Sequence, residues 1–310
     1  MTRRVAAGFG RLLPPLLIAA AVVIVIGAAL MGGCGSPSPS PTATVTVTAS
    51  ASGTAQPTAS PTGQPTASAS PTAPAAVSVI RLYFLRGAKL GVAERRVPRT
   101  TAVATASLQA LLKGPSNAER TAGLTSAIPT DTRLLRLSVA GGAAKVDLSA
   151  EFTADADAAA MGARVAEVVY TLTRFSTVRS VQLTVDGAVV DTVENVDLGE
   201  PQTRADWRDL EPIIFVESPG VGAVLTNPFT LSGTASVFEG SFQARLQDAS
   251  GRRVVLVTVQ ATRGAPGRGR FSRVVPYSTS ARSGTLIVFD RSMEDGSVQD
   301  EVRIPVTFGK

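Results

Sequence analysis

The sequence predicts two folded domains, an α+β domain followed by an all-β sandwich, behind an N-terminal stalk. Residues 36–75 consist of small, polar and proline residues without a charge. Residues 77–190 mix alternating apolar segments with segments of helical periodicity, whereas residues 212–310 contain short alternating segments separated by turn residues. These patterns predict a signal segment at 1–34, a stalk at 35–76, the α+β domain at 77–190, a linker at 191–211 and the β-sandwich at 212–310.

The composition removes several classes of catalytic and metal site. The chain has 310 residues, with no His and one Cys. Without His there is no Ser-His-Asp triad and no imidazole base that titrates near neutral pH. A single Cys excludes an intrachain disulfide and any zinc site that needs several Cys ligands. We therefore predict no cofactor and no metal site, and any chemistry would have to come from carboxylates, Lys, Tyr or hydroxyls.

The first 34 residues predict export and a membrane anchor. Three arginines precede an uncharged segment that ends in Met31-Gly32-Gly33-Cys34. This ending resembles the lipobox of bacterial lipoproteins, in which cleavage before the Cys leaves an N-terminal residue that carries lipid. Gly33 has the small side chain that cleavage requires, whereas Met31 stands where Leu is usual. The alternative is an uncleaved helix; both interpretations hold the rest of the chain outside the cytoplasm.

The stalk has the composition of a disordered tether. Residues 36–75 contain 8 Ser, 9 Thr, 8 Pro and 9 Ala, and no aromatic side chain. Such a segment cannot bury enough apolar surface to offset the entropy that ordering would cost. As a flexible coil it would span roughly 35 Å, which would hold the folded part away from the membrane.

The net charge gives little support to nucleic-acid binding. Removing the three arginines of the signal segment from the 30 basic residues leaves 27, against 24 acidic residues. Export also argues against a nucleic-acid partner. Residues 81–120 hold 8 basic side chains against 2 acidic ones. This asymmetry indicates either a solvated basic face or a surface for an anionic wall polymer or lipid headgroups.

The first half of the α+β domain begins with a hairpin and two helices. Residues 77–85 alternate into a strand, and residues 90–97 pair back on it. A helix that begins near residue 100 ends at Gly114-Pro115, where Gly suits a left-handed position and Pro cannot continue the helix. Ser116 and Glu119 have the spacing of a capping box, which opens a short second helix.

The second half predicts a hairpin, a long helix and a returning strand. Residues 134–139 and 144–148 alternate on either side of Gly141-Gly142, which indicates a hairpin. One face of a helix is formed by Met161, Val165, Val168 and Leu172. Residues 178–185 return as a strand. The order β-β-α-β-β-α-β predicts a mixed sheet with helices packed on one side.

Short motifs across this domain resemble the GerMN domain of spore-germination and sporulation proteins and of actinobacterial lipoproteins. In chain order they are Leu82-Tyr83-Phe84, Leu111-Leu112-Lys113-Gly114-Pro115, Glu119, Ala127-Ile128-Pro129, Val146-Asp147-Leu148-Ser149 with Phe152, and Tyr170-Thr171-Leu172-Thr173. The resemblance spans 77–190 in the right order. It implies an extracytoplasmic, non-enzymatic module and does not name a ligand.

Residues 212–310 predict a β-sandwich. The predicted strands are Ile213–Val216, Phe229–Ala235, Phe242–Leu246, Val254–Val259, Arg270–Val275, Thr285–Phe289 and Val302–Phe308. Short strands at this spacing, separated by turn residues, are typical of a sandwich. The segments around Glu217, Ser232-Gly233, Glu239 and Asp295-Gly296 resemble the immunoglobulin-like domain of bacterial spore-germination proteins, which commonly follows a GerMN domain.

We make specific predictions for two further segments, the acidic linker and a glycine-rich stretch. The acidic linker contains Trp207, the only Trp, which we expect to pack onto a neighbouring domain. The glycine-rich stretch Arg263–Arg270 carries three arginines but lacks the strand-to-helix context of a phosphate loop. We interpret it as a basic hairpin loop.

These features predict a lipid-anchored binding or scaffold protein on the outer face of the membrane, with envelope proteins or peptidoglycan as partners. The lipidation site is Cys34. The candidate binding residues are Lys113, Glu119, Asp147, Tyr170 and Glu239. Each also has a structural interpretation: Asp147 lies where a turn begins, and the ring of Tyr170 suits packing.

Two other classes of function stay open. A cell-wall glycan hydrolase would use Asp147 and Glu151 as acid and as base or nucleophile, with both carboxyls in a cleft and one pKa raised. A solute-capturing lipoprotein would need an enclosed pocket between the domains.

Overall fold

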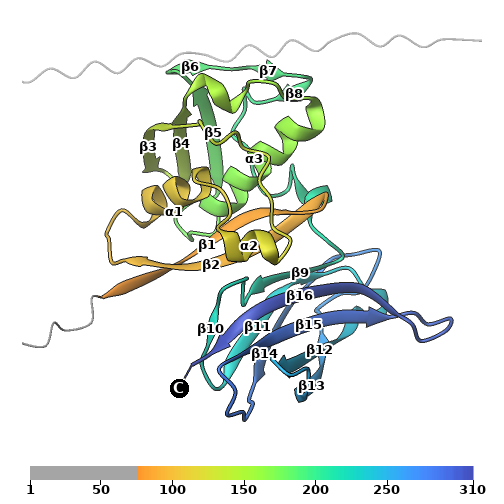
Figure 1. Cartoon of the computed structure of the whole chain (residues 1–310). Helices are drawn as coiled ribbons and strands as arrows, with labels where there is room; N and C mark the ends of the chain where they lie inside the picture. Colours follow the sequence, from red (N-terminus) through yellow and green to blue (C-terminus); the bar gives the residue numbers. More distant parts are fainter. Residues whose placement is uncertain (1–75, 310) are drawn as a thin grey trace, which may run out of the picture. The chain divides into compact units, whose positions relative to one another are not determined.

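The computed structural model describes residues 76–309 (Figure 1). The predicted signal segment, the lipidation site Cys34 and the stalk up to residue 75 lie outside the described residues. By their contacts, the described residues all belong to one compact unit. Within residues 76–309, no helix has the length and hydrophobicity to span a bilayer. The predicted fold class, an α+β domain followed by an all-β sandwich, is confirmed.

The α+β domain contains two separate strand ladders with helices between them. Its elements are β1 (Val77–Arg86), β2 (Lys89–Pro98), α1 (Val103–Leu112), α2 (Asn117–Thr121), β3 (Leu134–Ala140), β4 (Ala143–Leu148), α3 (Ala158–Leu172), β5 (Ser180–Val185) and β6 (Ala188–Val189). The sheet β3-β4-β5-β6 is mixed, because β4 and β5 run parallel. The β1–β2 hairpin forms its own ladder, and helix α3 contacts both β1 and β5 (Figure 1).

Strand β1 is buried on both of its faces. Leu82 and Phe84 belong to the main core beneath the helices, and Tyr83 belongs to a second cluster on the opposite face. All three side chains are at most 1% exposed. Successive side chains of a strand point in opposite directions, so a strand with neighbours on both sides buries every residue. The hairpin is therefore a layer between the helices and a second packing partner.

Helix α3 carries two buried ionisable side chains in addition to its predicted apolar face. Arg164 donates hydrogen bonds to the backbone carbonyls of Ala127 and Phe152. Glu167 accepts 2.7 Å hydrogen bonds from the Ser126 hydroxyl and the Ala127 backbone N–H. The helix thereby fixes two loops that would otherwise leave buried backbone groups unsatisfied. Helical periodicity of apolar residues cannot reveal such a role.

The second domain is a sandwich of two sheets. Its strands are β9 (Ile214–Ser218), β10 (Val224–Leu225), β11 (Phe229–Ala235), β12 (Ser241–Asp248), β13 (Arg253–Gln260), β14 (Gly269–Val275), β15 (Ser283–Arg291) and β16 (Val298–Phe308). One sheet has the order β14-β11-β9 and the other β10-β16-β15-β12-β13. Gly233 lets β11 approach β9, since a Cβ there would lie 2.0 Å from the Phe215 carbonyl oxygen. The short strand β10 was not predicted.

The linker is ordered and packs on the first domain. It contains the small hairpin β7 (Thr192–Val193) and β8 (Val196–Asp197) and a 3₁₀ turn at Arg208–Leu210. Trp207 lies against helix α3 at Gly162, where an added Cβ would come within 2.9 Å of the indole ring. The chain therefore leaves the first domain along α3 before it enters β9.

The burial of Glu167 predicts a specific dependence of stability on pH. Burial raises the pKa of Glu167 from 4.5 to about 8, although the bonds from Ala127 and Ser126 and the charge of Arg164 oppose the shift. The folded state then binds a proton that the unfolded state releases between these two values. The free energy of unfolding should therefore fall as pH rises through this window, by at most about 1.4 kcal/mol per pH unit, and level off above it.

Denaturant unfolding across the window, on wild type and on Glu167→Gln, measures this effect. Gln keeps the volume and the acceptor for the Ala127 N–H but cannot ionise, so its unfolding free energy should vary less with pH. Equal pH slopes in the two proteins would contradict the assignment.

Candidate binding site at the domain junction

The predicted candidate residues do not form one site. Glu119 is buried and has a structural role. Arg95 holds its carboxylate with two hydrogen bonds, at 2.8 and 2.5 Å, and the Ser116 backbone N–H donates a third. Burial opposes the charged form of Glu119, but the bonds from Arg95 and Ser116 outweigh it and lower its pKa. The predicted capping box with Ser116 is present at the start of α2.

Asp147 closes a turn. Its carboxylate accepts hydrogen bonds from the Thr184 hydroxyl at 2.9 Å and the Gly187 backbone N–H at 2.8 Å, which fixes the β5–β6 connection. The pKa of Glu151 is lowered, chiefly by a hydrogen bond with Ser149. A general acid of a glycan hydrolase needs the opposite shift. The hydrolase alternative therefore gains no support from this pair.

Lys113 and Glu239 are exposed residues at the ends of short elements. Lys113 follows helix α1, and Glu239 has a φ of 53° in a 3₁₀ turn between β11 and β12. Lys113 lies six residues before Glu119 in the sequence, whereas Glu239 is far from the other candidates along the chain. Among the described residues, no group of three or more acidic side chains has the geometry of a metal site.

Tyr170 is the candidate residue that belongs to a larger cluster of buried aromatic rings. Its ring packs with Tyr83 from β1 and Phe215 from β9. The three ring centres are 5.6, 6.0 and 5.9 Å apart, with tilted or edge-on geometry. Aromatic pairs prefer such arrangements, and these rings are almost fully buried. The cluster therefore joins α3, the β1–β2 hairpin and the second domain.

Arg204 from the linker caps this aromatic cluster. Its guanidinium carbon lies 5.1 Å from the ring centre of Tyr83 and 4.6 Å from that of Tyr170. The same guanidinium pairs with Glu217 of β9 at 2.7 Å and donates to the Tyr83 hydroxyl oxygen at 3.2 Å. Tyr83 in turn donates a 2.6 Å hydrogen bond to Glu217. Each polar group in this closed network has a partner of the right kind.

The protonation states of the network are fixed by its surroundings. Burial raises the pKa of Tyr83 well above its usual range, so its hydroxyl stays a donor at physiological pH. Burial opposes ionisation of Glu217, but the charge of Arg204 and the hydrogen bonds from Tyr83 and Arg204 lower its pKa overall. A charged carboxylate therefore faces a charged guanidinium and a neutral hydroxyl.

A second series of hydrogen bonds and ion pairs also links the first domain to the second. Tyr170 donates a 2.7 Å hydrogen bond to Glu211, which pairs with Arg268 at 3.1 Å. Arg268 also donates to the Pro212 carbonyl oxygen at 2.8 Å and to the Thr234 hydroxyl at 3.1 Å. The loop between β13 and β14, which contributes Arg268, is thus tied to helix α3 through Glu211.

Backbone hydrogen bonds add a third connection. The Glu94 N–H donates to the Val221 carbonyl, and the Val221 N–H donates to the Val92 carbonyl, both at 2.8 Å. Strand β2 therefore forms a short β-bridge with the segment after β9. Arg81 also donates a 2.9 Å hydrogen bond to the Ser218 hydroxyl. The two domains are joined by main chain as well as by side chains.

Two adjoining hollows lie beside this network, and we call them together the arginine groove. The larger has a volume of about 1090 Å³ and extends over the sheet β14-β11-β9 and the loop before β14. The smaller, of about 450 Å³, reaches Arg81 and Arg174 of the first domain. Both hollows include Arg204, Glu217, Ser232 and Arg270, so they are continuous.

The arginine groove is strongly basic. Seven arginines and two glutamates line it. Its arginines are Arg81, Arg174, Arg204, Arg208, Arg263, Arg268 and Arg270. Both glutamates are already paired, Glu211 with Arg268 and Glu217 with Arg204. Arg81 is also paired, with Glu94 at 3.0 Å, so within residues 76–309 the positive charge that has no ion-pair partner is that of Arg174, Arg208, Arg263 and Arg270.

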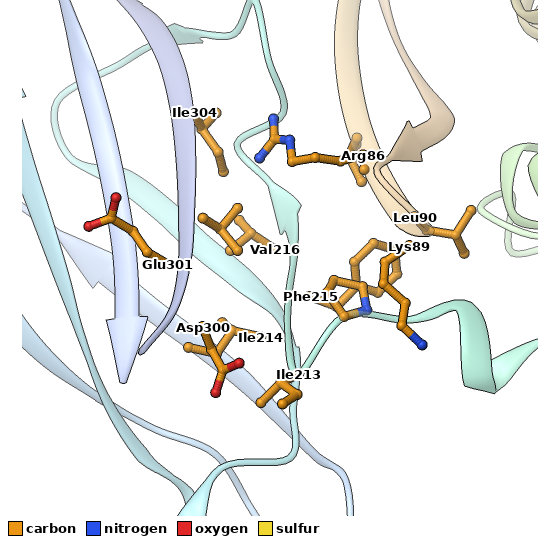
Figure 2. Close-up of a pocket in the computed structure, with 14 residues that line it drawn as sticks. Arg86, Lys89, Leu90, Ile213, Ile214, Phe215, Val216, Asp300, Glu301 and Ile304 are labelled. Atoms are coloured by element: carbon orange, nitrogen blue, oxygen red, sulfur yellow. The ribbon is translucent and has the colours of Figure 1, made fainter. Parts of the chain in front are cut away.

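A smaller cavity of about 260 Å³ is lined by the β1–β2 hairpin, β9 and β16 (Figure 2). Arg86 and Lys89 enter from the β1–β2 hairpin, β9 provides Ile214 and Phe215 to the apolar lining, and Asp300 comes from β16. The Nε of Arg86 is buried without a hydrogen-bond partner. The volume is below the roughly 300–1,000 Å³ typical of small-molecule sites.

The family comparisons agree with this two-domain arrangement. Residues 81–191 match Germane, described as "Sporulation and spore germination", and residues 213–297 match Gmad2, described as "Immunoglobulin-like domain of bacterial spore germination". The folded part of the chain is thus of a sporulation and germination type. More specifically, it is a GerMN-type domain followed by a Gmad2-type immunoglobulin-like domain, which confirms the resemblance of the motifs. Neither family is a family of enzymes.

Three solved structures are similar at low identity. A candidate lipoprotein from Clostridium perfringens is 23% identical, with a TM-score of 0.32, over 44% of this chain and 93% of its own. The tandem GerMN domains of the sporulation protein GerM from Bacillus subtilis are 20% identical, with a TM-score of 0.37, over 59% and 60%. The first of those domains alone is 21% identical, with a TM-score of 0.36, over 42% and 99%. No curated protein has a significant match.

Sequence patterns missed most of this site. Arg204, Glu211 and Glu217 come from the linker and the start of the second domain, and their partners lie far away in the chain. The three arginines of the stretch Arg263–Arg270 are evident in the sequence, but nothing in their local pattern indicates that they line a hollow. One signal could have found part of the site: Glu217 directly follows the apolar, buried run 214–216. A charged side chain next to a strand that is buried on both faces needs a partner of opposite charge.

Arg204→Ala should destabilise the protein by about 2–3 kcal/mol, because it leaves the partly buried Glu217 without its cation. Denaturant unfolding measures this, and Arg204→Lys should recover only part of it, since Lys lacks the planar fork. Arg208→Ala is the matched control: Arg208 is exposed, and its removal should change stability by less than about 0.5 kcal/mol. Equal effects of Arg204→Ala and Arg208→Ala would contradict the network.

Proposed function

We propose that this protein is held on the outer face of the cell membrane by a lipid on Cys34 and acts there by recognition of envelope proteins or wall glycan. The observation that carries the proposal is the combination of two germination-type domains with an N-terminal sequence that resembles a lipobox. Both domain families are named for sporulation and spore germination, processes that remodel the bacterial envelope. A sporulation-related role is therefore part of the proposal.

Recognition is favoured by the kind of surface that the two domains provide. The polar side chains of the junction are engaged with one another, and the arginine groove beside them offers uncompensated charge. Binding sites need such preorganised groups, whereas catalysis also needs an acid, base or nucleophile aimed at a reacting atom. Asp147 is instead used to close a turn.

The solute-capturing alternative has less support. The apolar cavity at the junction measures about 260 Å³, which is small for a ligand-enclosing site. The larger hollows are polar and lined by arginine, which suits an extended charged ligand more than an enclosed apolar solute. Surface recognition is therefore the function that the geometry favours.

Crosslinking on intact cells, with wild type and Cys34→Ala compared, tests the proposal. Wild type should fractionate with the membrane and become attached to an envelope protein or wall fragment, which mass spectrometry then identifies. Cys34→Ala cannot carry the lipid and should be released or mislocalised. The folded domains should be unaffected, because Cys34 lies outside residues 76–309.

Two results would count against the proposal. Retention of Cys34→Ala in the membrane fraction at the wild-type level would exclude lipidation as the anchor and favour an uncleaved helix. Wild type that is anchored but attached only to cytoplasmic components would place the domains on the wrong side of the membrane.

A further inference from the structure

We propose that the arginine groove binds an anionic, hydroxyl-rich wall polymer, with the phosphate or carboxylate groups of that polymer on Arg208, Arg263 and Arg270. This inference rests on the proposed function, because it names the ligand class of the recognition surface. It begins from the three arginines, which come from three different segments and line one hollow. Arg208 lies in the 3₁₀ turn of the linker, Arg263 in the loop after β13, and Arg270 on β14.

The three guanidiniums are unpaired. Each side chain is exposed, and among the described residues none of the three has an ion-pair or side-chain hydrogen-bond partner. The other two arginines of the larger hollow hold its glutamates, so no acid is left for these three. Gathering like charges costs free energy, and an anion that enters the groove relieves it. Arginine also binds phosphate and carboxylate with two parallel hydrogen bonds.

The smaller hollow also contains an arginine with a donor atom that has no partner in the described part of the chain. Arg174 has a buried Nε atom without a hydrogen-bond partner. An unsatisfied buried donor is costly unless a ligand or water supplies an acceptor. Burial lowers the pKa of Arg174, and the neighbouring charge of Arg81 adds to this effect. The charges of Glu94 and Glu217 oppose this lowering, but neither residue bonds to Arg174, whose Nε is left to donate a hydrogen bond to a ligand's oxygen.

The floor of the groove carries hydroxyl groups between the charges. In the β11–β14 ladder, Ser232 faces Ser272 and Thr234 faces Arg270. Gln260 and Thr262 also line the larger hollow. Alternating cations and hydroxyls match a chain that alternates anionic groups with sugar or polyol hydroxyls. The two hollows, of about 1090 and 450 Å³, have room for several units of such a chain, and a single small anion would fill little of this volume.

Nucleic acid and membrane lipid fit less well. Single-stranded nucleic acids bind on exposed aromatic rings as well as on cations. The two aromatic residues that line the groove, Tyr83 and Phe271, are 1% and 4% exposed. The predicted stalk would hold the groove roughly 35 Å from the membrane, which is within the wall and beyond the headgroups.

Binding of the full-length protein, purified in detergent, to defined polymers tests the proposal. The probes are poly(glycerol phosphate), polygalacturonate, neutral dextran, a single-stranded oligonucleotide and anionic lipid vesicles. The groove variant is Arg208→Ala/Arg263→Ala/Arg270→Ala. The matched control is Arg253→Ala/Arg273→Ala/Arg282→Ala, which removes the same charge from exposed positions outside the groove. Thermal unfolding verifies that both variants are folded.

Wild type should bind one or both anionic polymers and not dextran, and added salt should weaken the binding. The groove variant should lose at least about tenfold in affinity, whereas the control variant should stay within about threefold of wild type. Tighter binding of poly(glycerol phosphate) would identify a phosphate polymer as the source, and tighter binding of polygalacturonate a carboxylated glycan.

Equal losses in the groove and control variants would overturn the proposal, because the attraction would then be general. Tighter binding of the oligonucleotide or the vesicles than of either polymer would also overturn it. A protein that binds no polymer but is still anchored through Cys34 and attached to an envelope protein on cells would refute this inference alone and leave the proposed function intact.

Discussion

The arrangement of the two domains depends on the contacts that the guanidinium of Arg204 makes with both of them. It stacks near the rings of Tyr83 and Tyr170 and pairs with Glu217 of the second domain. Taken alone, each partner would be a poor choice for a buried position, because a tyrosine hydroxyl or a carboxylate away from water needs a hydrogen-bond partner. In the network, the hydroxyl, the carboxylate and the guanidinium provide hydrogen-bond partners for one another. A buried polar network of this kind favours one relative arrangement of its elements over others that would leave a group unpaired.

This arrangement also creates the arginine groove. The groove has walls from both domains, and Arg204 and Glu217 form part of its floor. Because Arg204 and Arg268 occupy the acids of the groove, Arg208, Arg263 and Arg270 have no ion-pair partner among the described residues. The same ion pairs that join the domains therefore determine the sign and strength of the field in the groove. The basic surface of the groove therefore depends on how the two domains are joined and does not follow from the modest net charge of the chain.

Local signals predicted most of the fold. The capping box of Ser116 and Glu119 is present, as are the hairpins and the apolar face of α3. Such features depend on residues close in the chain, so spacing alone reveals them. The separate ladder of the β1–β2 hairpin, the buried Arg164 and Glu167 and the junction network depend on distant contacts, which one sequence does not encode in any short pattern. Of the candidate binding residues, Tyr170 belongs to the junction network as a packed ring, the role that its size favours, and Glu119 lines a separate hollow of about 690 Å³ between the two domains.

The central claim is that Arg204 holds the two domains in one arrangement. Distance measurement between two spin labels tests it most directly, with labels on cysteines that replace the exposed Lys145 and Arg253. The full chain with Cys34→Ala serves as the background, because Cys34 is its only cysteine. A single narrow distance distribution is expected, and Arg204→Ala should broaden it. A broad distribution before Arg204 is changed, or a narrow one that Arg204→Ala leaves unaltered, would contradict the account.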